Sequence, residues 1–163
     1  MTDILRLLLI ILLLTAGLAA YFLVFGALFP RRVAKTQRVL NETTGRAFLV
    51  GAVNFLFFGV IAIVLFSVAE NAGGFLKGVI TIPALVITGL LALMLTFGLS
   101  GVVNELGARL FPEREAWRQA MWGSVALTFA CALPFVGWFL LLPYVSLTGF
   151  GAVILGFFQR ENT

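Results

Sequence analysis

Histidine is absent from the 163 residues of this chain, and cysteine occurs once, at Cys131. Histidine is the commonest general base and the commonest metal ligand, so its absence argues against most proton-transfer and metal-dependent enzymes. A single cysteine excludes an internal disulfide, a zinc cluster and a CxxC redox pair, and its ordinary role is that of a small apolar core residue. We therefore expect no catalytic residue, no cofactor site and no metal site.

Charge is also scarce. Charged residues make up 11% of the chain and hydrophobic residues 61%, whereas soluble domains average roughly 25% and 45–50%. A soluble fold of this size has too little interior to bury so much apolar surface, and the mean hydropathy of +1.10 indicates a lipid environment. The net charge of +4 then reflects the basic loops of a membrane protein rather than a nucleic-acid surface.

The uncharged runs of the chain are long enough to cross a bilayer, since a spanning helix needs about 20 apolar residues. The last run, 119–159, is about twice the hydrocarbon thickness as a continuous helix, so it must fold back, with a break at Pro134–Gly137, or contain a re-entrant segment. The sequence predicts a single all-α membrane domain, 1–163, folded as a compact bundle of five transmembrane helices. The spans are expected at about 7–29, 47–69, 79–104, 117–133 and 138–158.

The basic residues predict the orientation. With five spans, every lysine and arginine except Arg6 and Lys77 falls on one side of the membrane, and the positive-inside rule makes that side the cytoplasm. The N-terminus is then outside and the C-terminus inside a prokaryotic cytoplasmic membrane. The first 20 residues imitate a signal peptide, but the apolar run continues to Phe29, which favours an uncleaved first span.

Small and polar residues recur at every fourth position of the third and fourth spans, a pattern that favours close packing of transmembrane helices. Asn54 is the only strongly polar side chain predicted in mid-membrane, and we expect it to hydrogen-bond between helices rather than to conduct a substrate. The expected helix-packing residues are Asn54, Thr88, Ala92, Thr96, Ser100, Asn104, Ala120, Ser124 and Thr128.

Two inner loops carry most of the charge. In the segment 30–46, the spacing of the basic residues predicts a short helix lying along the cytoplasmic leaflet. Topogenic charge explains this segment, and an acidic cytoplasmic partner or anionic lipid is the alternative. In the second loop, Pro112 and the acidic residues that follow it are typical of the first turn of the fourth helix. The basic residues of the first loop are Arg31, Arg32, Lys35, Arg38 and Arg46.

Several short motifs resemble an uncharacterised multi-span membrane module of bacteria and archaea. The motifs are Phe29-Pro30-Arg31-Arg32-Val33, the segment 45–51, Ile82-Pro83-Ala84-Leu85, the segment 133–138 and the segment 149–153. That module is often fused to, or encoded near, bactofilin-like polymer-forming cytoskeletal proteins. The resemblance implies a membrane anchor or assembly platform and supplies no catalytic residues. This chain lacks the soluble β-helical domain of the fused examples.

These observations favour a non-enzymatic, multi-pass scaffold, anchor or accessory subunit that associates with other membrane proteins or with itself. The first alternative is a small transporter or channel subunit, in which Asn54 would contribute to substrate movement. The second alternative is a lipid-active enzyme at the inner face that uses Glu105, Arg109 and Glu113.

Overall fold

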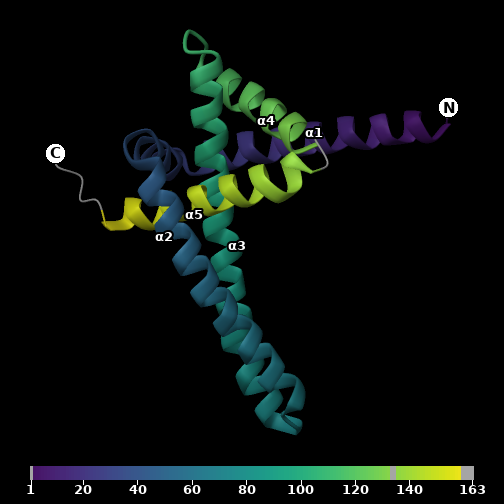
Figure 1. The fold of residues 1–163 in the computed structure, drawn as a ribbon, viewed down its shortest axis with the longest axis vertical. Helices are drawn as coiled ribbons and strands as arrows, with labels where there is room; N and C mark the ends of the chain where they lie inside the picture. Colours follow the sequence, from purple (N-terminus) through teal and green to yellow (C-terminus); the bar gives the residue numbers. More distant parts are fainter. Residues whose placement is uncertain (1, 133–134, 159–163) are drawn as a thin grey trace.

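The computed structural model describes residues 2–132 and 135–158, and within them the chain is helical apart from short turns, with no strand. The all-α class predicted from the sequence is confirmed for this part of the chain. A π-helical segment, η1 (Gly137–Leu141), precedes the last helix. The α-helices in chain order are α1 (Thr2–Leu28), α2 (Pro30–Asn71), α3 (Gly74–Leu110), α4 (Ala116–Ala132) and α5 (Leu142–Phe158) (Figure 1).

Three helical segments are long and apolar enough to cross a membrane, namely Pro30–Asn71, Gly74–Leu110 and Phe139–Phe158. The segment Leu12–Leu28 is apolar but shorter. These lengths and compositions fit a transmembrane protein. The count of five spans stays a prediction.

The basic segment 30–46 is helical, as the sequence predicts, but it is the first part of α2 rather than a separate helix. Pro30 occupies the first turn, where its missing N–H has no helical acceptor to lose. The helix bends at Thr43, whose φ of −144° and ψ of 45° are non-helical. The Thr43 hydroxyl donates to the Val39 carbonyl at 3.1 Å, so a side chain supplies a hydrogen bond at the bend.

The two connections at the ends of α3 differ in kind. The turn from α2 to α3 needs Gly74, which has a φ of +58°, a left-handed conformation that glycine adopts without strain. The connection from α3 to α4 is a turn at 111–115, where the Arg114 amide donates to the Phe111 carbonyl at 3.2 Å. Pro112 therefore lies in this turn. The prediction that it occupies the first turn of the fourth helix is wrong, because α4 begins at Ala116.

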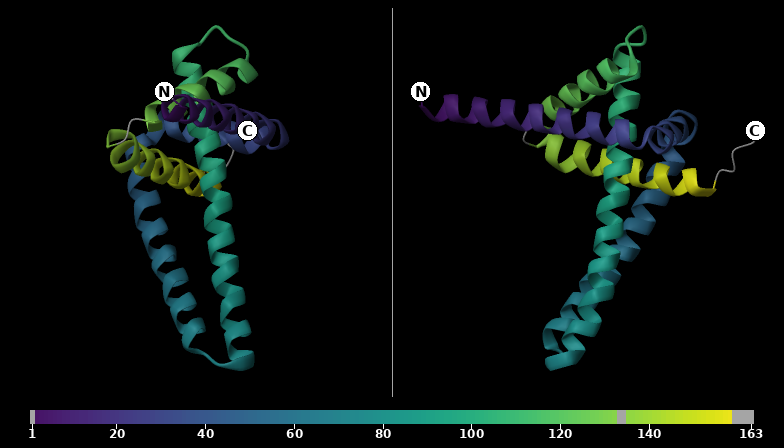
Figure 2. Two further views of the ribbon diagram at one scale, coloured as in Figure 1. Left: turned by 90° about the vertical axis from the view of Figure 1, so that its right-hand side faces the viewer. Right: turned by 180° about the vertical axis from the view of Figure 1, so that it is seen from behind.

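The second half of α2 and the first half of α3 form a long antiparallel hairpin that extends away from the other helices (Figure 1). Both α1 and α5 run across this hairpin near its open end, as the two views of Figure 2 show. Beyond the crossing, the leg 52–71 measures about 30 Å, which matches the hydrocarbon thickness of a bilayer. This arrangement differs from the compact bundle that the sequence predicts.

Glycine explains why α5 can cross the hairpin so closely. A Cβ built on Gly98 of α3 would lie 2.3 Å from the Gly149 carbonyl carbon of α5, and one built on Gly51 of α2 would lie 1.8 Å from the Leu147 carbonyl oxygen. Without side chains between them, the backbone of α5 meets that of α3 at Gly149 and that of α2 at Leu147 and Gly151. Phe150, exposed by only 1%, lies beside this crossing.

The predicted reversal between the last two spans lies partly outside the described residues, because residues 133 and 134 are among those not described. Gly137, at the start of η1, approaches the end of α4. A Cβ there would lie 2.5 Å from the Cys131 carbonyl oxygen and 2.7 Å from that of Ala130. Glycine is therefore required where η1 meets α4.

Candidate functional site

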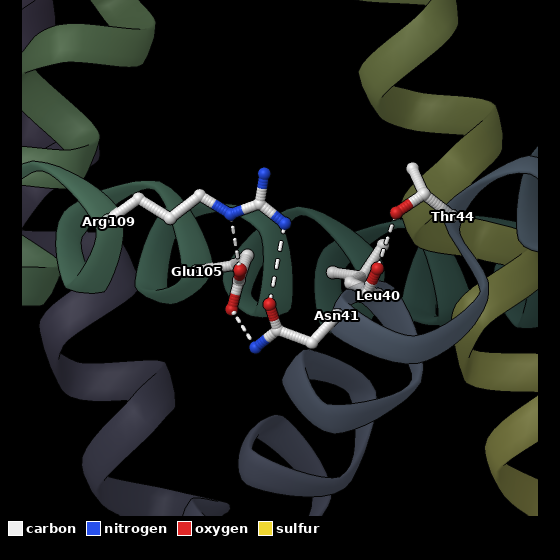
Figure 3. Close-up of polar contacts among 5 residues, drawn as sticks. All are labelled: Leu40, Asn41, Thr44, Glu105 and Arg109. Atoms are coloured by element: carbon white, nitrogen blue, oxygen red, sulfur yellow. Dashed lines mark hydrogen bonds and ion pairs between the residues drawn. The ribbon is translucent and has the colours of Figure 1, made fainter.

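The most elaborate polar contact in the described chain joins α2 to α3 next to the bend (Figure 3). Asn41 donates from Nδ2 to Glu105 Oε2 at 2.7 Å, and Arg109 donates from Nε to Glu105 Oε1 at 2.6 Å. A longer bond of 3.4 Å joins the Arg109 guanidinium to Asn41 Oδ1. We call these three residues the polar clasp. It fixes the bent part of α2 against the cytoplasmic end predicted for α3.

The members of the clasp differ in exposure. The Glu105 side chain is only 9% exposed, whereas that of Arg109 is 62% exposed. A buried carboxylate needs partners, since an unpaired buried charge costs several kcal/mol. The Arg109–Glu105 pair lies within α3 and its arginine is solvated, so Asn41 alone joins the two helices in this clasp, and its 2.7 Å bond to Glu105 is shorter than its 3.4 Å bond with Arg109. The geometry is that of a structural connection with both carboxylate oxygens engaged.

A shallow pocket of about 260 Å³ lies beside the clasp. Its lining includes Glu105, Arg109 and Tyr144 with two threonines, and aliphatic residues of α2, α3 and α5 supply the rest. Glu113, the third residue of the lipid-active alternative, lies in the exposed turn between α3 and α4 and does not line this pocket. The structure thus brings Glu105 and Arg109 together and leaves Glu113 apart. Among the described residues, no three acidic or cysteine side chains form a metal-binding group.

The expected helix-packing residues fall into three groups by their exposure. Ser100, Ala120 and Ser124 are buried, at 0%, 5% and 0% exposure. Thr88 and Ala92, farther along the hairpin on α3, are exposed. The half-buried members are Asn54, Thr96, Asn104 and Thr128.

Hydrogen bonding by these side chains is mostly local. Asn54 donates to the Val50 carbonyl of its own helix at 2.8 Å, so the interhelical bond expected of its amide is not the one found. Thr88, Asn104 and Thr128 likewise donate to the carbonyl four residues earlier. Backbone carbonyls are the nearest acceptors in lipid, which explains this pattern. Thr96 does the same and also accepts a bond across helices, from Tyr21 of α1 at 3.1 Å.

Glycines make the closest helix contacts, and on α3 and α4 they lie outside the four-residue series of small and polar residues. Gly107 of α3 faces the Gln119 carbonyl of α4, and Gly123 of α4 faces the Val103 carbonyl of α3. A Cβ at these two glycines would lie 1.9 Å and 2.1 Å from those oxygens. The spacing 98, 107 on α3 is irregular, so the only available signal was glycine itself in a long apolar run.

The basic residues of the first loop lie on the first part of α2 and just after its bend. Arg31, Arg32, Arg38 and Arg46 are exposed, and Lys35 is half-buried. Arg32 places its guanidinium carbon 4.7 Å from the centre of the Phe157 ring of α5. Val33 and Leu40, on another face of the same segment, are each 4% exposed. The segment is thus an amphipathic helix with its apolar face on the protein.

No family model, no curated protein and no solved structure matches this chain.

Proposed function

We propose that this chain is a non-enzymatic, multi-pass scaffold or accessory subunit of a prokaryotic cytoplasmic membrane, which associates with other membrane helices. One observation carries the proposal. The small-residue series of α3 is buried at Ser100 but exposed at Thr88 and Ala92, with Gly89 exposed between them and nothing within 4 Å of a Cβ built there. Small residues let helices approach closely in lipid, so this open face suits a helix from another chain.

The first helix supports the same proposal. Its N-terminal part extends beyond the rest of the molecule (Figure 1), and Leu5, Leu9 and Leu12 are 71%, 54% and 62% exposed. Ala16 and Gly17 are exposed on this helix as well. A helix so little covered by its own chain has surface available for another.

Gentle solubilisation followed by mass spectrometry of the intact assembly tests the proposal. We expect a defined complex, and we expect Ala92→Leu to dissociate it while the circular dichroism spectrum stays unchanged. Val86→Phe is the matched control, because Val86 is also exposed on α3 but lies about 120° around the helix from Ala92. A monomer in the unmodified protein, or a complex equally weakened by both variants, contradicts the proposal.

The resemblance to the bactofilin-linked module extends the proposal to a partner class, a polymer-forming cytoskeletal protein at the cytoplasmic face. Exposed Arg31 and Arg38 offer positive charge to such a partner. Recovery of a filament-forming protein with the intact complex supports this extension. A complex that contains only other membrane proteins contradicts it and leaves the scaffold proposal standing.

The proposed topology is five spans with the N-terminus outside. Its specific rival is a chain in which only the α2–α3 hairpin spans, since α1 and α5 run across that hairpin (Figure 2). Labelling of Thr2→Cys in a Cys131→Ser background with a membrane-impermeant maleimide distinguishes the two topologies. The new cysteine reacts from outside if the chain has five spans, and it reacts only from the cytoplasm if the hairpin alone crosses the membrane. Gly73→Cys and Glu113→Cys serve as outside and inside controls, because both lie at exposed connections.

A further inference from the structure

A groove of about 340 Å³ lies where the first part of α2 faces α3 and α5. Its lining combines two cationic side chains with a mainly apolar wall. This combination sets it apart from the pocket at the polar clasp, where the arginine is already paired with a carboxylate. The residues that matter here are Arg32, Lys35, Leu90, Leu93, Phe97 and Phe157.

Among the described residues, neither cation has an acidic partner. Within the described residues, the ion pair formed is that of Arg109 with Glu105, and it involves neither Arg32 nor Lys35. The Phe157 ring, 4.7 Å from the Arg32 guanidinium carbon, holds that side chain at the mouth of the groove by a cation–π contact. The N–H donors of Arg32 and the ammonium group of Lys35 therefore stay available for a ligand.

The groove also has a direction. Thr36 packs on Gly101 of α3, because a Cβ on that glycine would lie 2.6 Å from the Thr36 methyl carbon. Lys35 is the neighbour of Thr36 in the chain and Arg32 lies about one turn earlier in α2, so both cations are anchored near that level of α3. The apolar wall descends from Phe97 to Leu90, about 10 Å along α3 toward the tip of the hairpin. Charge lies at one end of the groove, and apolar surface runs from it along α3 into the hairpin.

We infer that this groove binds one anionic phospholipid. The phosphate lies between Arg32 and Lys35, and an acyl chain follows Phe97, Leu93 and Leu90. A neutral lipid lacks the net charge that complements the two cations of the groove, and an acidic peptide lacks an acyl chain that fits the apolar wall. The inference rests on the membrane location assumed in the proposed function, but it does not require a protein partner.

Native mass spectrometry of the purified full chain measures this binding directly. The detergent-solubilised protein is mixed with equal amounts of phosphatidylglycerol and phosphatidylcholine that carry the same acyl chains. We expect one phosphatidylglycerol to be retained in preference to phosphatidylcholine. The double variant Arg32→Gln, Lys35→Gln is expected to weaken that binding by about thirtyfold, since each basic residue near an anionic lipid contributes about 1 kcal/mol and 1.4 kcal/mol is tenfold.

Two matched controls separate a bound lipid from general attraction to an acidic surface. Arg31→Gln, Arg38→Gln removes the same charge from exposed residues of the same helix that do not line the groove, and affinity should change less than about threefold. Gly156→Leu fills the groove, whereas Gly156→Ala adds a methyl group with ordinary contacts of 3.8 Å and 3.9 Å. We expect the leucine variant to lose the lipid and the alanine variant to keep it.

Several results would overturn the inference. Equal retention of phosphatidylcholine means that charge is not recognised. An equal loss of affinity in both double variants means that the attraction is diffuse, and undiminished binding in Gly156→Leu means that the groove is not the site. Because Gly156→Leu alters no charge and Arg32→Gln, Lys35→Gln adds no bulk, failure of one variant to fold leaves the other informative. An unmodified protein that is a monomer and still retains the lipid would contradict the proposed function alone.

Discussion

Replacing Gly51 by alanine tests the backbone crossing of α2 and α5. The new methyl carbon would lie 1.8 Å from the Leu147 carbonyl oxygen and 2.8 Å from the Gly151 amide nitrogen. Ordinary carbon–oxygen contacts at helix interfaces are about 3.3–3.6 Å, so the two helices must separate locally by about 1.5 Å. Both atoms that the methyl group meets belong to the backbone, and neither can rotate away.

The separation sets the expected cost. A gap of about 0.5–1 Å already forfeits a quarter to a half of the dispersion energy of the atoms that face it, and overpacking a core typically costs about 1–3 kcal/mol. We therefore expect Gly51→Ala to lower the free energy of unfolding by about 2–3 kcal/mol. Gly59→Ala is the matched control, since this glycine lies in the same helix with nothing within 4 Å, and alanine there should be neutral or stabilise by up to about 1 kcal/mol.

Equilibrium unfolding in mixed micelles with increasing dodecyl sulfate measures both variants. Circular dichroism reports helix content, and tryptophan fluorescence reports the surroundings of Trp117 and Trp122 in α4 and of Trp138 in η1. If Gly51→Ala and Gly59→Ala unfold within about 0.5 kcal/mol of each other, the close crossing of α2 and α5 is not the packing of the protein in solution. The steric argument is then refuted.

Two further perturbations examine the clasp and the hairpin turn. Asn41→Ala removes the donor to the buried Glu105 carboxylate and should cost about 1–3 kcal/mol in the same unfolding measurement. The control Glu42→Ala, at an exposed neighbouring position, should change the free energy of unfolding by less than about 0.5 kcal/mol. Equal values for the two variants would refute a stabilising role for the clasp. Gly74→Ala places an alanine at a φ of +58° and should lower the free energy of unfolding by about 1–2 kcal/mol. The control Gly73→Ala, at a φ of −86°, should leave it unchanged. The reverse order would show that the turn has a different backbone conformation.

The sequence predicted the location of the hairpin turn well, because turns and spans leave a strong local signal. The charged and glycine-containing segment 70–78 separates two long apolar runs, and the turn lies within it. The basic segment was predicted to be helical and is. Its continuity with the second span was missed, because the change from charged to apolar residues near Arg46 marks a change of environment and not the end of a helix. Near Arg46, hydropathy indicates where the chain enters the membrane, whereas helix propensity indicates that the helix continues.

The contacts of the candidate site were less accessible from sequence. Asn41 was not selected, although it joins Glu105 and Arg109, because its partners lie 64 and 68 positions along the chain. Asn54 was selected because it is polar, yet its amide bonds to Val50 of the same helix. A polar residue in an apolar run signals that a partner exists, but the sequence does not say whether that partner is its own backbone or another helix.

The order of amino acids by itself determined that this chain is helical, apolar and punctuated by basic segments, since each of these properties depends on residues close together in the chain. Only the tertiary structure decided that α5 crosses the hairpin through Gly51 and Gly98, and that the first part of α2 forms a charged mouth over an apolar groove. The physical reason is that a helix apolar on all sides carries no periodic pattern to mark the face that meets protein. In such helices the choice of face depends on which backbones can approach one another.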